Sequence, residues 1–286
     1  MVSIYIHQLE ITDKLKHFSS EEINVVLNIS EITLKRILST FPKVNYFKKH
    51  KGNADVYKQV PIQAYFGKNA DKTGFVEVDY VEHSGGNGSG IFCITGDYVD
   101  VCLQWIARSA GLGKNEASIR SIHEKNLEKI YHKIYEYHPD NCKTILKILL
   151  EKATGNYDVS RSRPYKKDDN AHVEQKNGDK VRKLVGYHRY DTEKQIKILN
   201  ELYEVEDLIT NFFTASQKLK EIIKDEKGRV IKKIHEKAKT PYQRLMESKI
   251  DKKIKKKLTK LFKQLNLVEL RERSDKLRDK LSHSIR

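Results

Sequence analysis

Residues 74–81 read Gly-Phe-Val-Glu-Val-Asp-Tyr-Val, and this stretch decides the fold class. Apolar and polar side chains alternate with period two from Phe75 to Val81, which is typical of a β-strand. β-branched and aromatic residues dominate the stretch, as they do in strands that pack on a core. Asp79 is therefore a carboxylate on a predicted buried strand, a setting that suits a metal ligand.

Strand and helix signals alternate from this stretch outward to residue 185. The glycine-rich segment 85–90 predicts a flexible turn, and further strands are predicted over 91–95, 99–107, 134–138 and 157–162. Apolar residues at helical spacing predict helices over 115–131, 142–153 and 171–185, with Gly155 ending the second. This order predicts an α/β fold, a mixed sheet flanked by helices, with its site at strand ends.

A helix-turn-helix is predicted in the N-terminal region, residues 1–42. Ser19 and Glu22 form a capping-box pair, Asn28 marks the turn and Ser30 caps a second helix over 31–39. The buried side of this second helix would carry Ile32, Ile37 and Leu38. The outward side, where a recognition helix meets a DNA groove, would carry Thr33, Lys35 and Arg36. An ordinary helical hairpin with a solvated face is the alternative.

The remaining chain divides into a linker over 43–73, a core over 74–189 and a helical, basic C-terminal region over 190–286. The linker contains a basic run and few periodic apolar residues. Residues 251–286 hold 13 Lys and Arg against 5 Asp and Glu, a net charge of +8. This segment is either a solvated amphipathic helix or a contact with DNA or a second subunit.

The overall charge indicates a polyanionic partner. The net charge is +16 over 286 residues, and this balance favours nucleic acid, with a solubilised surface as the alternative. Cys93, Cys102 and Cys142 lack CxxC spacing, which suits a reducing cytoplasm and argues against a zinc finger. No apolar run approaches the ~20 residues of a membrane span, and a signal-peptide pattern is absent.

Three carboxylates form the candidate catalytic and metal-binding site: Asp79, Asp140 in Pro139-Asp140-Asn141, and Glu174 in the predicted helix 171–185. Two Mg²⁺ or Mn²⁺ ions about 3.5–4 Å apart can clamp a scissile phosphate. Asp79 would bridge both ions, and Asp140 and Glu174 would each bind one. By themselves, three acids among 39 Asp and Glu are weak evidence.

Basic and polar residues near the triad are candidate DNA contacts: Arg161, Arg163, Lys166, Lys167, Asn177, Lys180 and Arg182. Glu77 shares the face of Asp79 by period two, but we interpret it as a solvated or edge-facing residue. Asp168 and Asp169 are interpreted as solvated loop acids. Mg²⁺ prefers oxygen ligands, so His138 and His172 are set aside as ligands.

Residues from about 51 to 247 resemble bacterial insertion-sequence transposases with an integrase catalytic core of the DDE type shared with retroviral integrases. The motifs that carry the resemblance are 74–79, 139–141, Arg-Ser-Arg-Pro-Tyr-Lys-Lys at 161–167, Asn-Ala-His-Val-Glu-Gln-Lys-Asn at 170–177, 181–187 and 238–245. The resemblance implies a ribonuclease H-like fold, two divalent ions, and DNA strand cleavage followed by transfer to target DNA. It maps the triad onto Asp79, Asp140 and Glu174.

Three features depart from this family's pattern. Cys142 stands where the family usually has Gly, and Gly178 stands where it usually has Trp. The Asp140-to-Glu174 spacing is 34 residues, slightly shorter than in close relatives. Two hypotheses follow: an active transposase, or a catalytically impaired relative that only binds DNA. A plain DNA-binding scaffold without a carboxylate site is the third.

The resemblance also predicts partners and location. It implies double-stranded DNA, both element ends and target, as substrate, and a homodimer or higher oligomer that brings two ends together. The location expected is the bacterial cytoplasm, at the nucleoid. Members of the family often carry more residues before the helix-turn-helix than residues 1–18 supply.

Overall fold

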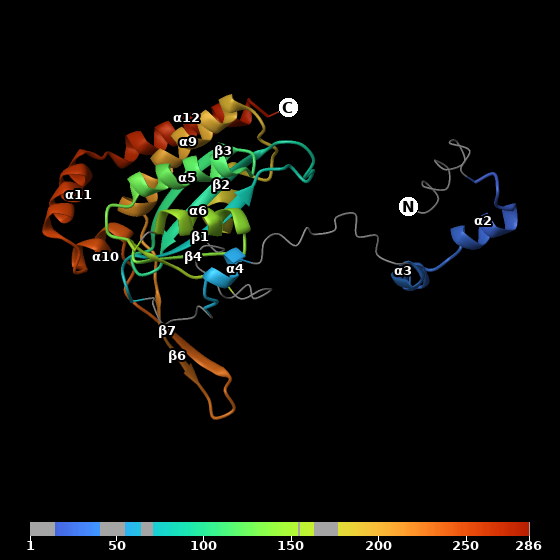
Figure 1. The fold of residues 1–286 in the computed structure, drawn as a ribbon, viewed down its shortest axis with the longest axis horizontal. Coiled ribbons are helices and arrows are strands. Elements are labelled where there is room, and N and C mark those ends of the chain that lie inside the picture. The colour runs from blue at the N-terminus through green and yellow to red at the C-terminus, as the bar shows by residue number, and fades with distance from the viewer. Residues whose placement is uncertain (1–14, 41–54, 64–70, 154, 163–176, 286) are drawn as a thin grey trace. The chain divides into compact units, whose positions relative to one another are not determined.

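The computed structural model describes residues 15–40, 55–63, 71–153, 155–162 and 177–285. The chain divides into two compact units, Met1–Asn53 and Ala54–Arg286, and each is considered by itself (Figure 1).

Two short helices make up the described part of the first unit, α2 (Ser20–Leu27) and α3 (Glu31–Thr40). The predicted capping box is present, since the Glu22 amide donates to the Ser19 hydroxyl and the Glu22 carboxylate accepts from the Ser19 amide. α2 has no buried residue, and Ile32 and Ile37 on α3 are 81% and 40% exposed, so the prediction that these two side chains are buried is wrong. The helix-turn-helix therefore remains a prediction from sequence.

A five-stranded mixed sheet forms the centre of the second unit, in the order β3-β2-β1-β4-β5. Its strands are β1 (Phe75–Glu82), β2 (Cys93–Asp100), β3 (Trp105–Leu112), β4 (Glu136–Pro139) and β5 (Asp158–Val159). β1, β2 and β3 are antiparallel, whereas β4 and β5 run parallel to β1. The predicted α/β class and mixed sheet flanked by helices are confirmed, and the arrangement is consistent with a ribonuclease H-like core.

The boundaries predicted for the second and third strands, 91–95 and 99–107, are wrong. Gly96 and Asp97 interrupt the apolar pattern, yet both lie within β2. Gly96 is required by packing, because a Cβ there would approach the side chain of Ile122 to 2.5 Å. The true turn lies between Asp100 and Trp105, where Gln104 has a φ of 60° and the Asp100 carboxylate accepts from the Leu103 amide.

The two faces of the sheet are covered by different helices (Figure 1). α5 (Glu116–Lys129) and α6 (Lys143–Ala153) cover the face that carries Val76, Val78 and Tyr98. α9 (Glu193–Leu208) covers the opposite face, which carries Val81 and Ala110, and α12 (Leu267–Ser282) packs on α9. Sheet and helices thus form a layered α/β core.

The predicted linker contributes to this core. A short helix, α4 (Asp55–Gln59), contacts α6, and Val60 is buried in the main apolar cluster. Ile62 forms an isolated parallel bridge with Arg161. Residues 55–63 are thus folded against the core.

Several helices, two of them π-helices, occur in the described chain after residue 176. Of the predicted helix 171–185, the described part consists of a π-helix, η2 (Asn177–Arg182), and one helical turn, α8 (Lys183–Val185). α9 continues into a second π-helix, η3 (Ile209–Phe213), and the later helices are α10 (Pro241–Glu247), α11 (Lys252–Gln264) and α12.

The expectation of an entirely helical C-terminal region is wrong over β6 (Leu219–Lys224) and β7 (Val230–His235), an antiparallel hairpin that projects from the core (Figure 1). Its β-branched residues favour strand pairing that a charge pattern alone does not reveal. In the part of the chain that the structure describes, no helix combines the length and apolar character of a membrane span.

Candidate functional site

The two described acids of the triad lie on or directly after two neighbouring strands. Asp79 is on β1, and Asp140 directly follows the last residue of β4. β1 and β4 are parallel, with Val78 opposite Pro139. Carried one residue farther, this register places Asp79 opposite Asp140, and neighbouring strands lie about 4.8 Å apart. Glu174 lies outside the described residues.

Local hydrogen bonds hold both carboxylates. Asp79 is half-buried and its Oδ1 accepts from the amide of Tyr80 at 2.8 Å. Asp140 Oδ1 accepts from the amide of Cys142 at 2.9 Å, an Asx turn that leads into α6. Asp140 as a whole residue is exposed, but partial desolvation of its carboxylate by neighbouring atoms raises its pKa. The hydrogen bond from the Cys142 amide and the charge of Lys114 oppose this rise.

A network around Arg161 fixes the backbone after Asp140. The Arg161 guanidinium donates to the Asn141 side chain at 2.8 Å and to the carbonyls of Val60 and Tyr57. It also lies 5.4 Å from the centroid of the Tyr57 ring. The Asn141 amide donates onward to the carbonyl of Ser162 at 2.9 Å. The hydrogen bonds of Arg161, predicted to be a DNA contact, thus tie α4 to the turn that carries Asp140.

A row of charged residues, not predicted from the sequence pattern, crosses the sheet beside Asp79. Asp97 on β2 lies opposite both Asp79 on β1 and Arg108 on β3. Arg108 donates to Asp207 of α9 at 2.7 Å and also to the carbonyl of Lys180 in η2. Burial alone would lower the pKa of Arg108, but the carboxylates of Asp207 and Asp97 raise it. The period-two position of Asp97 after Thr95 was the available signal.

Arg108 and Arg182 hold the segment that follows Glu174 against this sheet. η2 begins three residues after Glu174, and its Lys180 carbonyl accepts from Arg108. Arg182 donates to the carbonyl of Glu82, the last residue of β1, at 2.8 Å. Through these contacts η2 is held against the sheet beside β1.

Lys114 is a further cation at this end of the sheet. Its ammonium group pairs with the carboxylate of Glu82 at 2.7 Å, across the ends of β1 and β3. Burial opposes its charge, but Glu82 and, at longer range, Asp140 raise its pKa. A positive charge therefore lies within electrostatic reach of Asp140.

Glu77 and His138 differ from their predicted settings. Glu77 is 0% exposed, so its interpretation as a solvated or edge-facing residue is wrong. It lies opposite His138, whose ring nitrogens contact the hydroxyls of Ser160 at 2.7 Å and Ser162 at 3.4 Å. His172, Asp168 and Asp169 lie outside the described residues.

The oxygen donors present suit a hard divalent cation, since Asp79 and Asp140 offer carboxylates from two rigid strands. Among the described residues, no group of three or more His, Cys, Asp and Glu is placed to hold a metal ion. Glu174 is not in that set, so the third ligand remains a prediction.

The other predicted DNA contacts fall into three groups. Arg36 is exposed, and the Thr33 hydroxyl contacts that of Ser30 at 2.8 Å. Lys180 and Arg182 are half-buried in η2. The last group is not placed by the structure. Arg163, Lys166 and Lys167 lie outside the described residues, and only the backbone is described for Lys35 and Asn177.

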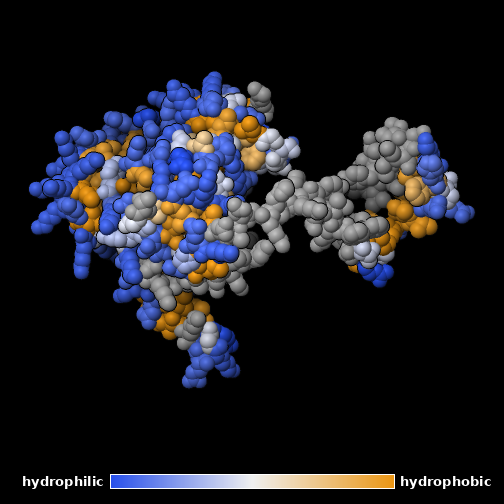
Figure 2. Space-filling view, in the orientation of Figure 1, coloured by the Kyte–Doolittle hydropathy of each residue, from blue (hydrophilic) through white to orange (hydrophobic). Residues whose placement is uncertain are grey.

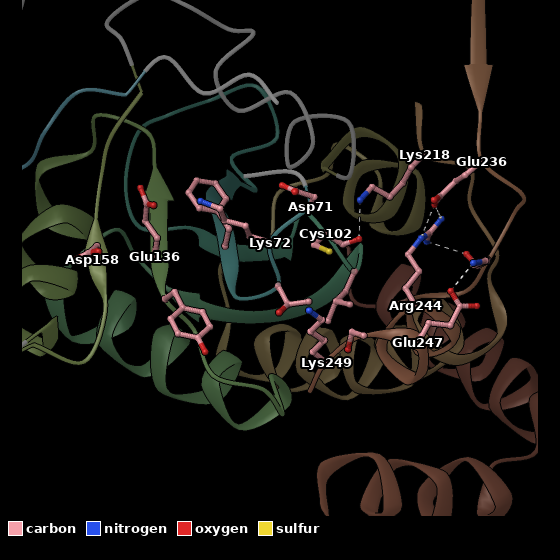
Figure 3. Close-up of a pocket in the computed structure, with 16 residues that line it drawn as sticks. Asp71, Lys72, Cys102, Glu136, Asp158, Lys218, Glu236, Arg244, Glu247 and Lys249 are labelled. Atoms are coloured by element: carbon pink, nitrogen blue, oxygen red, sulfur yellow. Dashed lines mark hydrogen bonds and ion pairs between the residues drawn. The ribbon is translucent and has the colours of Figure 1, made fainter. Parts of the chain in front are cut away.

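A cavity of about 790 Å³ lies at the opposite end of β1 and β4, lined by Phe75 and Glu136 (Figure 3). Arg244 pairs there with Glu236 at 2.8 Å, and Lys218 donates to the carbonyl of Cys102. Asp79 in the middle of β1 and Asp140 after the end of β4 are absent from its lining, so this cavity is separate from the candidate site.

The chain is similar to a bacterial protein in sequence and to retroviral proteins among the solved structures. No protein-family model matches the chain. The uncharacterised protein y4rM of Sinorhizobium fredii (strain NBRC 101917 / NGR234) is 33% identical over 230 residues, 76% of this chain and 63% of that protein. The chain thus spans less than two thirds of this relative.

Two of the similar solved structures are retroviral. The catalytic core domain of BIV integrase has a TM-score of 0.39 and 12% identity, covering 61% of this chain and 95% of that one. The simian T-cell lymphotropic virus intasome in complex with PP2A regulatory subunit B56 gamma has a TM-score of 0.37 and 13% identity, covering 72% of this chain and 69% of that one.

Proposed function

We propose that this protein is a DDE-type DNA transposase that cleaves element ends and joins them to target DNA. The observation that carries the proposal is the parallel register of β1 and β4, in which Val78 lies opposite Pro139 and the next residues along the two chains are Asp79 and Asp140. The motifs around residues 79, 140 and 174 support it, because they resemble those of integrase-type transposases.

Asp79, Asp140 and Glu174 would hold two Mg²⁺ or Mn²⁺ ions, which when bound would activate a water or 3′-hydroxyl and stabilise the leaving oxygen. The protein's own contribution is to keep the ligands in place. Asp79 is held by the central strand, Asp140 by the Cys142 amide, and the Glu174 segment leads into η2 beside β1. The Lys114 ammonium adds positive charge where a phosphodiester would approach.

The geometry at Cys142 favours an active enzyme over an impaired relative. Among the described residues outside glycine, positive φ is confined to Gln104, so Cys142 does not need glycine's left-handed conformation. Its amide instead donates to Asp140. The departure from the family's Gly thus leaves the turn around Asp140 intact.

The test is Mg²⁺-dependent nicking and strand transfer on duplex DNA taken from both flanks of the reading frame. Asp79→Asn, Asp140→Asn and Glu174→Gln should each lower activity at least ~100-fold, because loss of even outer partners of metal ligands costs 10–100-fold. Asp275→Asn on α12 removes an exposed carboxylate and is the matched control. Full activity of Asp140→Asn would refute the assignment, and DNA binding without nicking by the natural protein would support the impaired relative.

The proposed partners follow from this reaction. Element ends and target are both double-stranded DNA, and joining two ends calls for a homodimer or higher oligomer. Thr33, Lys35 and Arg36 of α3 are the proposed sequence-reading contacts. The proposed location is the bacterial cytoplasm, at the nucleoid.

A further inference from the structure

α11 differs in charge from the helix that follows it. Its 13 residues include seven lysines and no acid: Lys252, Lys253, Lys255, Lys256, Lys257, Lys260 and Lys263. α12 carries five Lys and Arg but also four Asp and Glu over 16 residues. Solubility alone therefore does not explain why every charge on α11 is positive. The neighbouring helix α12 is also charged, but it carries residues of both signs.

The apolar side of α11 fixes which way its lysines face. Leu258 is fully buried, and the ring of Phe262 stacks with Tyr242 at a centroid distance of 4.8 Å and with Phe212 at 6.0 Å. These contacts bind α11 to α10 and η3. The opposite side of the helix is thereby held toward solvent, and hydrophilic residues mark the outer edge of the core where α11 lies (Figures 1 and 2).

Two of the seven lysines have internal roles. Lys255 donates to the carbonyls of Met246 and Ser248 at the end of α10, and Lys257 lies 5.2 Å from the centroid of the Tyr131 ring. Within the described part of the chain, the other five form no ion pair: Lys252, Lys253, Lys256, Lys260 and Lys263. Four of these five, all but Lys253, line one shallow groove of about 470 Å³ along the helix.

The spacing of these lysines destabilises α11 when no anionic partner is bound. Lys252, Lys256 and Lys260 follow one another at i,i+4 spacing, and like charges at that spacing repel. No acidic side chain of α11 relieves the repulsion. A polyanion laid along the groove would do so, and lysine suits it because its ammonium group binds phosphate as a point charge without reading bases.

We propose that the lysine groove of α11 binds the phosphate backbone of double-stranded DNA, independently of its sequence. From Lys252 to Lys263 the helix rises about 16 Å, which spans roughly five base pairs of duplex. The proposal rests on the proposed function in that it takes DNA as partner. It adds a surface distinct from both the carboxylate pair and α3.

The test measures how binding of a 30-base-pair duplex of scrambled sequence depends on salt, by fluorescence anisotropy from ~50 to ~200 mM KCl. Each phosphate contact contributes about 0.9 to the slope of log affinity against log salt. Lys256→Gln/Lys260→Gln/Lys263→Gln should lower the slope by up to about 2.7. The matched control, Lys276→Gln/Arg278→Gln/Lys280→Gln on α12, removes the same charge and should lower it by less than about 1.

Two further results keep the inference separate from the proposed function. Circular dichroism should show that the α11 variant melts no lower than the natural protein, because repulsion has been removed. Equal slopes for the α11 and α12 variants would overturn the α11 assignment alone if the natural protein still nicks DNA. If the natural protein neither binds nor nicks DNA, both proposals fail.

Discussion

Replacing Arg161 tests whether this residue serves the fold or the DNA. Three hydrogen bonds leave its guanidinium, at 2.8, 3.2 and 3.3 Å, and all end on atoms of the core. A charged donor at a buried site contributes about 1.5–3 kcal/mol per bond, but Arg161 is half-buried and two of the bonds are long. At about 1 kcal/mol each, Arg161→Met should lower the free energy of unfolding by about 3 kcal/mol.

Arg161→Lys should lower the free energy of unfolding by about 2 kcal/mol, since the lysine ammonium group can replace one of the three hydrogen bonds. For a unit of this size, 1 kcal/mol corresponds to about 2–4 °C in Tm, so the Met variant should melt roughly 6–12 °C lower. Thermal unfolding followed by circular dichroism measures this. Arg271→Met, at an exposed arginine 3.9 Å from Glu206, is the matched control and should change Tm by about 2 °C or less.

The same variants separate the two roles on DNA. If Arg161 holds Asn141, nicking activity should fall in both Arg161 variants while the salt dependence of DNA binding stays unchanged. A Tm within about 2 °C of the natural protein, together with a salt slope lower by about 0.9 in Arg161→Met, would instead assign Arg161 to a phosphate and refute the internal role.

Two further predictions concern acid stability and Cys142. Burial lowers the pKa of His123 to about 4. As the pH falls below about 6.5, the His123 ring takes up a proton in the unfolded chain but stays neutral in the folded protein. The folded state should therefore lose about 2 kcal/mol of stability through His123 between pH 7 and pH 5. In urea titrations, the stability lost between pH 7 and pH 5 should be about 2 kcal/mol smaller in His123→Gln than in the natural protein, and an equal loss in both would contradict the assignment. Cys142→Gly should lower stability by about 0.5–1 kcal/mol without raising nicking activity, because no left-handed backbone is present there; a several-fold gain in nicking would mean that Cys142 does misplace Asp140.

Elements with a strong local period were predictable from sequence. β1, α5 and α6 lie within a few residues of their predicted ranges, because alternation and capping residues such as Asn115 act over short distances. β2 was divided wrongly because Gly96 and Asp97 are turn-forming residues in isolation. Their place in a strand depends on Ile122 and Arg108, which are distant in sequence.

The β6–β7 hairpin was missed for a related reason. Lys and Glu among its isoleucines are typical of an exposed helix, and the pairing of Ile222 with Lys233 is not a property of either segment alone. Strand propensity depends on cross-strand neighbours, so a single-sequence pattern underestimates it.

By itself the sequence determined which carboxylates are candidates, through the motifs around Asp79, Asp140 and Glu174, and it determined the basic charge that indicates a polyanionic partner. Only the tertiary structure decided that Asp79 and Asp140 share one register and that Asp97 and Arg108 continue the row. It also decided that Arg161 holds the turn after Asp140. Local periods specify elements, whereas these pairings join residues 11 to 61 positions apart and arise only when strands select their neighbours.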